Sequence, residues 1–350
     1  MTDTLVVPHL DVDHALGRDM VWCASFDLAW RALRDVLGGP AELRLERGWD
    51  RLENDRALSL VRALNATPIR RQVALPGSCL ALAGEHTEEW VERARTLLRD
   101  RFGDAEASMF PSEPAPGFLV AYAYADVRLP FTVPFAPVQG GLTFDGTQVE
   151  GFGVWDPANE AERALFHGRV EQVLVHHHRF PFEYDPEGVH EDEGPSEEFV
   201  IELETANRDG RVIVACVLPE RTLAGTVAVA LSRMRDDAAS LPGARLREQE
   251  KLRVPCIDFD ATRRYGELRG RGLDNPGFPG HLFGEVLERV HFVLDQGGAR
   301  VVSEALFGGL SLPPRTFDCS YPFLVMVLRR GASMPFLAVW VEAAALLRKR

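Results

Sequence analysis

The stretch VLDQGGARVVSEALFGGLSLPPRTFDCSYPFLVMVLRR, residues 293–330, begins and ends like buried β-strand. Between these apolar ends stand a Gly-rich run and then the Pro313-Pro314 pair. A connection of about twenty residues without secondary structure is uncommon in compact domains and is usually functional. A plain surface connection between two core strands is the alternative interpretation.

The composition limits the class of protein. The chain has 350 residues, 46% of them hydrophobic, and can bury a large core as one domain or as two closely packed ones. We favour a single domain over residues 1–350, because no segment reads as a linker. The formal net charge of -13 repels nucleic-acid backbones and anionic lipid headgroups. The first 20 residues lack the pattern of a secretory signal, so we expect a cytoplasmic protein without nucleic-acid or membrane partners.

The cysteines argue against a cross-linked frame. There are five, an odd number, and they are scattered without a CxxC pair. This pattern predicts reduced thiols rather than disulfides or a cysteine-rich zinc site.

Helical patterns dominate the first third of the chain. Apolar residues recur at helical spacing over residues 25–37, and Gly38-Gly39-Pro40 follows as a stop. Residues 56–65 predict a second helix. A third is expected over residues 88–102, with Thr87 as N-cap and Gly103 as the C-terminal stop.

Strand patterns dominate the remainder. Residues 117–129 are too apolar for a wet face and predict a central strand. Residues 196–220 alternate around a turn at 207–210 and predict a hairpin, and helical spacing returns at 222–234. Further strands are expected at 288–295, 321–330 and 334–342. The fold class is therefore α+β, with a large, mostly antiparallel sheet and helices concentrated in the N-terminal third.

Signals for catalysis or metal binding are weak. Consecutive strand residues alternate between faces, so of His176, His177 and His178 at most the first and last could chelate together. A polar strand end is the simpler interpretation. Asp258 and Asp260 could be imagined as paired carboxylates, but alternation along one strand explains them better. No phosphate-binding glycine loop, nucleophile elbow or HExxH motif is present, which predicts no metal, no cofactor and no enzymatic activity.

Several motifs, in the same order along the chain, resemble the serpin family. RVHFVLDQGGARVVSEA resembles the strand that ends in the serpin hinge, and YPFLVMVLRRGASMPFLAVWVE the closing pair of strands. AYADVRLPFTVPFAP is similar to the end of the third strand of the large sheet, and CASFDLAWRALRD to the first helix. The resemblance covers residues 20–38 and 117–347. It indicates a divergent, trimmed serpin-like protein of bacterial type, with residues 1–20 as an N-terminal extension.

The resemblance implies a reactive-loop segment over residues 293–316. A loop strand that inserts into the sheet after cleavage points alternate side chains inward, so every second one must be small. The alternation of side chains along this segment suits insertion, because the opposite alternation would point Arg300 and Glu304 into the sheet and bury their charges. The implied hinge residues are Gly298, Ala299, Val301, Ser303 and Ala305.

The same resemblance implies two further sets of residues. The candidate bait and scissile region consists of Leu306, Phe307, Leu310, Leu312 and Pro313. The breach region consists of Phe131, Pro134 and Phe135, with Phe131 standing where the family has Trp.

Departures from the family pattern bear on which of two functions the loop has. Val301 and Val302 stand where inhibitory serpins favour Ala, and Pro313 directly follows the scissile position expected at Leu312. Our hypothesis is therefore a monomeric, non-inhibitory protein that binds a partner through its loop or surface. The alternative is an inhibitor of a chymotrypsin-like or elastase-like serine endopeptidase, acting by loop cleavage and strand insertion.

Overall fold

The computed structural model describes residues 4–15, 17–44, 50–104, 113–115, 117–157, 160–179, 198–236, 244–284, 286–297 and 315–350. Contacts divide the chain into two compact units. Unit 1 comprises Met1–Trp22, Leu129–Ala261 and Val290–Arg350, and unit 2 comprises Cys23–Arg128 and Thr262–Arg289. The single domain expected from the sequence stays a prediction.

An eight-stranded sheet forms the centre of unit 1. Its middle strands are apolar and buried on both faces, which suits the interior of a large sheet. The neighbouring strands β10 and β11, β11 and β12, β12 and β20, and β20 and β21 are antiparallel, whereas β1 runs parallel to β2. The order is β1 (Leu5–Val6), β2 (Met20–Cys23), β21 (Leu337–Val341), β20 (Phe323–Arg329), β12 (Gly210–Cys216), β11 (Glu198–Leu203), β10 (Val173–Arg179) and β13 (Ala244–Arg245).

A four-stranded sheet packs against the first one. The rings of Phe199 and Phe317 meet edge to face across the two sheets, with centroids 5.3 Å apart. Gly153 is required here, because any side chain would collide with the Leu252 carbonyl of the neighbouring strand. The order is β19 (Thr316–Asp318), β14 (Lys251–Pro255), β9 (Gly151–Val154) and β6 (Ala136–Pro137), and β7 (Leu142–Phe144) pairs with β8 (Thr147–Val149).

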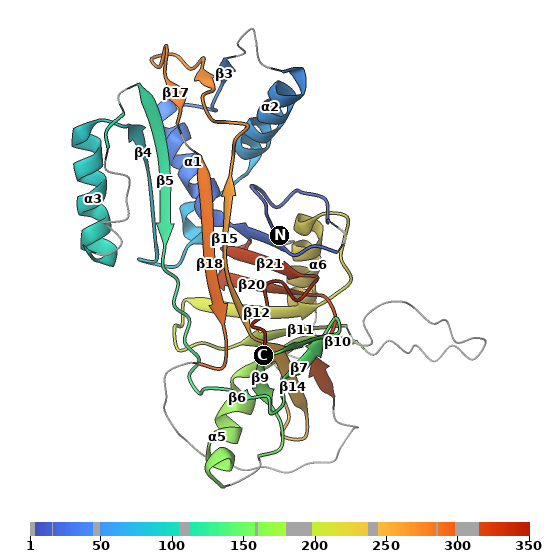
Figure 1. Ribbon diagram of the computed structural model, residues 1–350. Coiled ribbons are helices and arrows are strands. Elements are labelled where there is room, and N and C mark those ends of the chain that lie inside the picture. The colour runs from blue at the N-terminus through green and yellow to red at the C-terminus, as the bar shows by residue number, and fades with distance from the viewer. Residues whose placement is uncertain are drawn as a thin grey trace. The chain divides into compact units, whose positions relative to one another are not determined.

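Two helices cover strands of unit 1. α5 (Glu160–Glu171) contacts β9 and β10, and α6 (Leu223–Asp236) contacts β10 and β11 (Figure 1). The hydroxyl of Thr222 accepts a hydrogen bond from the Gly225 N–H at 3.1 Å, as expected of a residue that caps α6.

In the part of unit 2 that the structure describes, a five-stranded sheet is accompanied by the helices α1, α2 and α3. α1 (Ala24–Leu37) packs on the sheet and on α2 (Arg51–Ala66), and α3 (Glu88–Phe102) lies along β4 (Figure 1). A short 3-10 helix, η1, spans Arg71–Val73. The strand order is β3 (Leu43–Arg44), β16 (Gly272–Leu273), β17 (Leu282–Phe283), β5 (Phe118–Ala125) and β4 (Cys79–Glu85).

Two further strands pass from one unit to the other. β15 (Ile257–Arg264) and β18 (Leu287–Leu294) pair with each other. Within the described residues, no helix is long and apolar enough to cross a membrane.

The predicted α+β fold class is confirmed, and most predicted elements are found. Gly38 ends α1 in a left-handed conformation with φ 72°, and the Thr87 hydroxyl caps α3 by accepting the Trp90 N–H. The hairpin is formed by β11 and β12, with Gly210 N–H donating to the Asn207 carbonyl at 3.1 Å.

One expectation about burial is wrong. β5 lies inside its sheet, but Leu119 is its only buried residue and Ala121 is exposed. β4 pairs with β5 along its length, whereas β17 pairs only with Phe118 and Leu119. A strand with one short neighbour and small Ala side chains on one face keeps that face partly accessible to water.

Candidate functional site

The candidate site consists of the residues that flank the segment 298–314 on either side. The predicted hinge residues and the bait residues lie outside the described residues, so their roles stay predictions. The exit, Asp295–Gly297, and the return, Arg315–Asp318, are both described and both belong to unit 1. Their contacts define what holds the intervening segment.

The exit follows β18 directly. The Asp295 carboxylate accepts the Gly297 N–H at 2.7 Å through Oδ1, and its Oδ2 lies 3.5 Å from Arg348 Nη2. The Gln296 carbonyl accepts the Phe135 N–H at 3.1 Å. Side-chain and backbone contacts therefore both hold the exit in place.

Arg348, close to the C-terminus, joins three carboxylates at the exit. Its guanidinium lies 3.6 Å from Glu150, 3.1 Å from Asp258 and 3.5 Å from Asp295. The Arg348 N–H donates to the Cys256 carbonyl at 2.9 Å, which fixes the tail beside β15. Asp258 is thus an ion-pair partner, not half of a catalytic pair with Asp260.

The breach residues lie beside the exit. Phe131 and Phe135 are buried, and their rings meet edge to face with centroids 4.8 Å apart. The Pro134 carbonyl accepts a hydrogen bond from Arg169 Nε at 2.8 Å. Phe131 and Phe135 are therefore in contact, the Phe135 N–H links them to Gln296, and the breach role of the three residues stays a prediction.

The return is held by a buried ion pair. Arg315 donates from Nε and Nη2 to the two carboxylate oxygens of Glu250, at 2.6 Å and 2.9 Å. Glu250 is only 1% exposed, and it also accepts the Arg247 N–H at 2.9 Å. Two parallel N–H···O bonds to a water-excluded carboxylate are among the stronger polar contacts.

Aromatic packing supports the return strand. The Arg315 guanidinium lies 5.2 Å from the Phe317 ring centroid, in position for a cation–π interaction. The His178 ring meets the same Phe317 ring edge to face at 5.2 Å. Burial, and secondarily the nearby Arg315 charge, lower the pKa of His178 to about 4, so this histidine is neutral near pH 7.

The other two histidines of the run each lie close to a glutamate carboxylate. His176 Nε2 lies 2.9 Å from Glu202, and His177 Nε2 lies 3.6 Å from Glu198. The pairing register shifts between Val175 and His177, which breaks the alternation expected of a regular strand. Among the described residues, no group of three or more His, Cys, Asp or Glu could hold a metal ion.

Glu202 is the centre of a buried charge network. It lies 2% exposed, contacts His176 and Arg211, and is 3.4 Å from Arg330. Burial opposes ionisation, but hydrogen bonds from His176 and Arg211 outweigh it and lower the Glu202 pKa to about 2. The glutamate therefore stays charged and ties together β10, β11, β12 and the end of β20.

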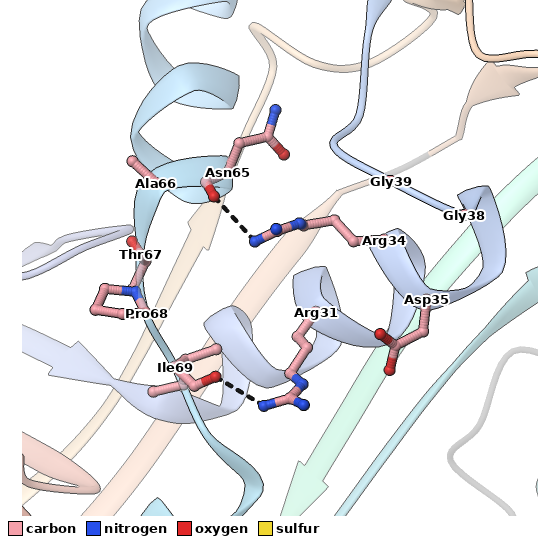
Figure 2. Close-up of a pocket in the computed structure, with 10 residues that line it drawn as sticks. All are labelled: Arg31, Arg34, Asp35, Gly38, Gly39, Asn65, Ala66, Thr67, Pro68 and Ile69. Carbon is pink, nitrogen blue, oxygen red and sulfur yellow. Dashed lines mark hydrogen bonds between the residues drawn. The ribbon is translucent and has the colours of Figure 1, made fainter.

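Unit 2 carries an open pocket of about 590 Å³ at the C-terminal ends of α1 and α2 (Figure 2). Arg31 donates to the Ile69 carbonyl and Arg34 to the Asn65 carbonyl, each at 2.9 Å. Cations at helix C-termini stabilise the carbonyls that the helix leaves without partners. The Arg34 bond is therefore explained by the stability of the two helix ends, whereas Arg31 bonds to the chain that follows α2.

Sequence reasoning missed Arg348, Glu250 and Arg315. Arg315 and Glu250 are 65 positions apart, and Arg348 is 53 and 90 positions from Asp295 and Asp258 and much farther from Glu150, so no local spacing could indicate these pairs.

Comparisons with known proteins concern the fold. Neither a protein-family model nor a curated protein matches the sequence. Among solved structures, the chain is similar to a serpin from the trematode Schistosoma haematobium, at 14% identity and TM-score 0.47, over 93% of this chain and 94% of that one. It is similar to serpin-12 of Manduca sexta at 12% identity and TM-score 0.49, over 96% and 95%. It is also similar to human thyroxine-binding globulin in complex with its hormone, at 10% identity and TM-score 0.47, over 95% and 93%.

Proposed function

We propose that this protein is a non-enzymatic, serpin-like binding protein that presents residues 298–314 to a protein partner. The observation that carries the proposal is that both ends of this segment are anchored on the same unit. Asp295 is paired with Arg348 at the exit, and Arg315 with Glu250 at the return.

Fixed ends favour recognition. Binding residues often lie on loops that a rigid scaffold positions, since less conformational entropy is then lost on binding. The return continues into β19, which is paired with β14 from Lys251 to Arg253. In this proposal the protein acts as a cytoplasmic monomer, and the partner contacts the apolar residues between Leu306 and Leu312.

The residues of the loop argue against efficient inhibition. Val301 and Val302 add β-branched bulk where a strand would have to enter a sheet, and Pro313 follows the expected scissile position. Most serine proteases do not cut before proline, so a fast cut at Leu312 is not expected.

Inhibition remains the second candidate function. The small residues Ala299, Ser303 and Ala305 share one parity, as an inserting strand requires. Among the described strands, β18 has β15 as its neighbour, which leaves its other edge for a further strand. Under this hypothesis, a chymotrypsin-like or elastase-like protease is trapped after it cuts the loop.

Limited proteolysis with elastase, subtilisin and chymotrypsin separates the two functions. Mass spectrometry locates the cut, and a thermal melt follows the cut product. Binding without insertion predicts a cut between Ala305 and Arg315 with an unchanged melting temperature and no covalent adduct. A large rise in melting temperature, or an adduct of protease size, would overturn the non-inhibitory proposal and establish the inhibitor.

A matched pair of variants sharpens the test. Ala299→Arg places a charge on the inward parity, whereas Arg300→Lys keeps a charge on the outward one. Trapping by strand insertion predicts loss of inhibition in the first variant only, with little change in the stability of either uncut protein. Equal behaviour of the two variants would exclude insertion.

A further inference from the structure

Cys216 and Cys319 place two buried thiols in contact. Cys216 is the last residue of β12, and Cys319 directly follows β19. They are 2% and 0% exposed, and their Sγ atoms are 3.8 Å apart although the residues are 103 positions apart in sequence. The loop contacts described above do not use either thiol.

The two residues belong to different sheets of unit 1. Cys216 pairs with Phe199 in the eight-stranded sheet. The Cys319 N–H donates to the Arg253 carbonyl of β14 at 3.0 Å, which places its backbone in the four-stranded sheet. The sulfur atoms therefore meet where the return strand packs on the larger sheet.

We propose that Cys216 and Cys319 are a redox-sensitive pair that closes into a disulfide and ties the return strand β19 to β12. A disulfide requires the two sulfur atoms to approach to about 2 Å. The sulfur atoms are 3.8 Å apart, so they are already in van der Waals contact and must come closer by about 2 Å for the bond to form. Intracellular disulfides, where they occur, are often transient and redox-sensing.

A small disulfide such as oxidised glutathione supplies the oxidising equivalents. The thiolate of one cysteine attacks a sulfur atom of the small disulfide, forms a mixed disulfide and expels one glutathione thiolate. The second cysteine thiolate then attacks the protein sulfur of the mixed disulfide and expels the other glutathione. The two protein thiols lose two hydrogens in total, and one glutathione disulfide becomes two thiols.

Access controls the rate of this reaction. Burial, and secondarily the neighbouring Cys216, raise the pKa of Cys319 well above its ordinary value, so the folded protein holds little Cys319 thiolate. The bond should therefore form slowly in the native state and quickly during refolding. Cys79 is only partly buried, so the rate at which its thiol reacts in the native protein serves as a comparison for the two buried thiols.

The disulfide has a consequence for the loop. It closes a ring that includes residues 298–314, and it fixes the return beside the Arg315–Glu250 pair. Cross-links across long segments stabilise by restricting the unfolded chain. Any effect on partner binding rests on the proposed function, whereas the bond and the stability gain do not.

The test uses the full chain in two arms. Native protein is incubated with oxidised glutathione, and a second sample is unfolded and refolded in a glutathione redox buffer. Peptide mapping without reductant identifies cross-linked peptides, and thermal melts compare the oxidised and reduced forms. We expect a Cys216–Cys319 peptide after refolding, a slower yield in the native arm, and a higher melting temperature that falls when dithiothreitol is added.

Variants assign the bond. Cys216→Ser should abolish the cross-link and the temperature shift, and Cys79→Ser should preserve both. Because the mapping of the unsubstituted chain needs no variant, a misfolded Cys216→Ser protein does not remove the test. The proposal is overturned if both thiols stay reduced in the refolding arm, if they pair with other cysteines, or if the cross-linked form melts at a lower temperature.

Discussion

Two buried glutamates, one in each unit, show how partners decide the charge of a carboxyl group. Glu202 in unit 1 contacts His176 and Arg211, and its pKa falls to about 2. Glu288 in unit 2 accepts the Tyr265 hydroxyl at 2.7 Å, and burial raises its pKa to about 8. Both are less than 5% exposed, so the depth of burial alone does not explain the difference.

The surroundings of Glu288 favour the neutral form. Burial is the main cause of its raised pKa, the Tyr265 hydrogen bond opposes it, and the nearby Asp27 carboxylate adds to it. Within the described chain, Glu288 Oε1 has no hydrogen-bond partner. Desolvation of a carboxylate without a cationic partner would cost a large free energy there. Glu288 in unit 2 is therefore protonated, whereas Glu202 in unit 1 is an ionised carboxylate with partners.

The largest expected effect concerns Glu288. Because its pKa is higher in the folded state, its contribution to stability is complete below about pH 4.5 and is lost as the pH rises through about 8. The loss is at most on the order of 5 kcal/mol. In Glu288→Gln this part of the pH dependence should disappear, which urea unfolding between pH 5 and pH 9 would measure. Glu53→Gln on exposed α2 is the control, and an identical pH slope in wild type and Glu288→Gln would show that the glutamate is ionised in the fold.

Glu202 should behave in the opposite way. Its contribution is present above about pH 4.5 and is lost as the pH falls through about 2, since the folded pKa is depressed. Glu202→Gln should lower the free energy of unfolding at pH 7 by about 3 kcal/mol, because the Arg211 cation loses its anion and the hydrogen bond from His176 loses its charged acceptor. The exposed pair of Glu204 with Arg245 offers Glu204→Gln as a control, with a loss below about 1 kcal/mol. Equal losses in the two variants would mean that the buried network adds nothing.

The same contrast applies to the return of the loop. Arg315→Ala leaves Glu250 buried without its main cation and should cost about 2 kcal/mol. Arg315→Lys keeps the charge but loses the two parallel hydrogen bonds, so its loss should be intermediate. Chemical unfolding measures both, and faster proteolysis near residue 315 should accompany the loss. If the Ala variant is as stable as wild type, the ion pair does not anchor the loop.

The exit should give the smallest effect. Arg348 and Asp295 are each 29% exposed, so water and salt screen their interaction. Arg348→Ala should cost less than about 1 kcal/mol, and the loss should shrink further in 1 M salt. Lys349→Ala is the neighbouring control. A loss as large as that of Arg315→Ala would show that the two ends of the loop are held equally strongly.

Local patterns in the sequence were sufficient for most elements. The helix over residues 24–37 and the strands around 199–216 and 323–341 follow from hydrophobic spacing and from turn residues such as Gly38 and Asn207. These features depend on neighbours within a few positions, so the chain itself carries the information. Hydrophobic spacing likewise predicted the α+β class, and the order of several motifs along the chain carried the resemblance to serpins.

Only the tertiary structure determined which charged side chains and which thiols lie in contact. Arg315 and Glu250 are 65 positions apart, Arg348 and Asp258 are 90 apart, and Cys216 and Cys319 are 103 apart. Their pairing depends on how β14, β15, β19 and the C-terminal tail come together. The pKa values of Glu202 and Glu288 also follow from burial and from partners elsewhere in the chain, and the sequence around each glutamate shows neither.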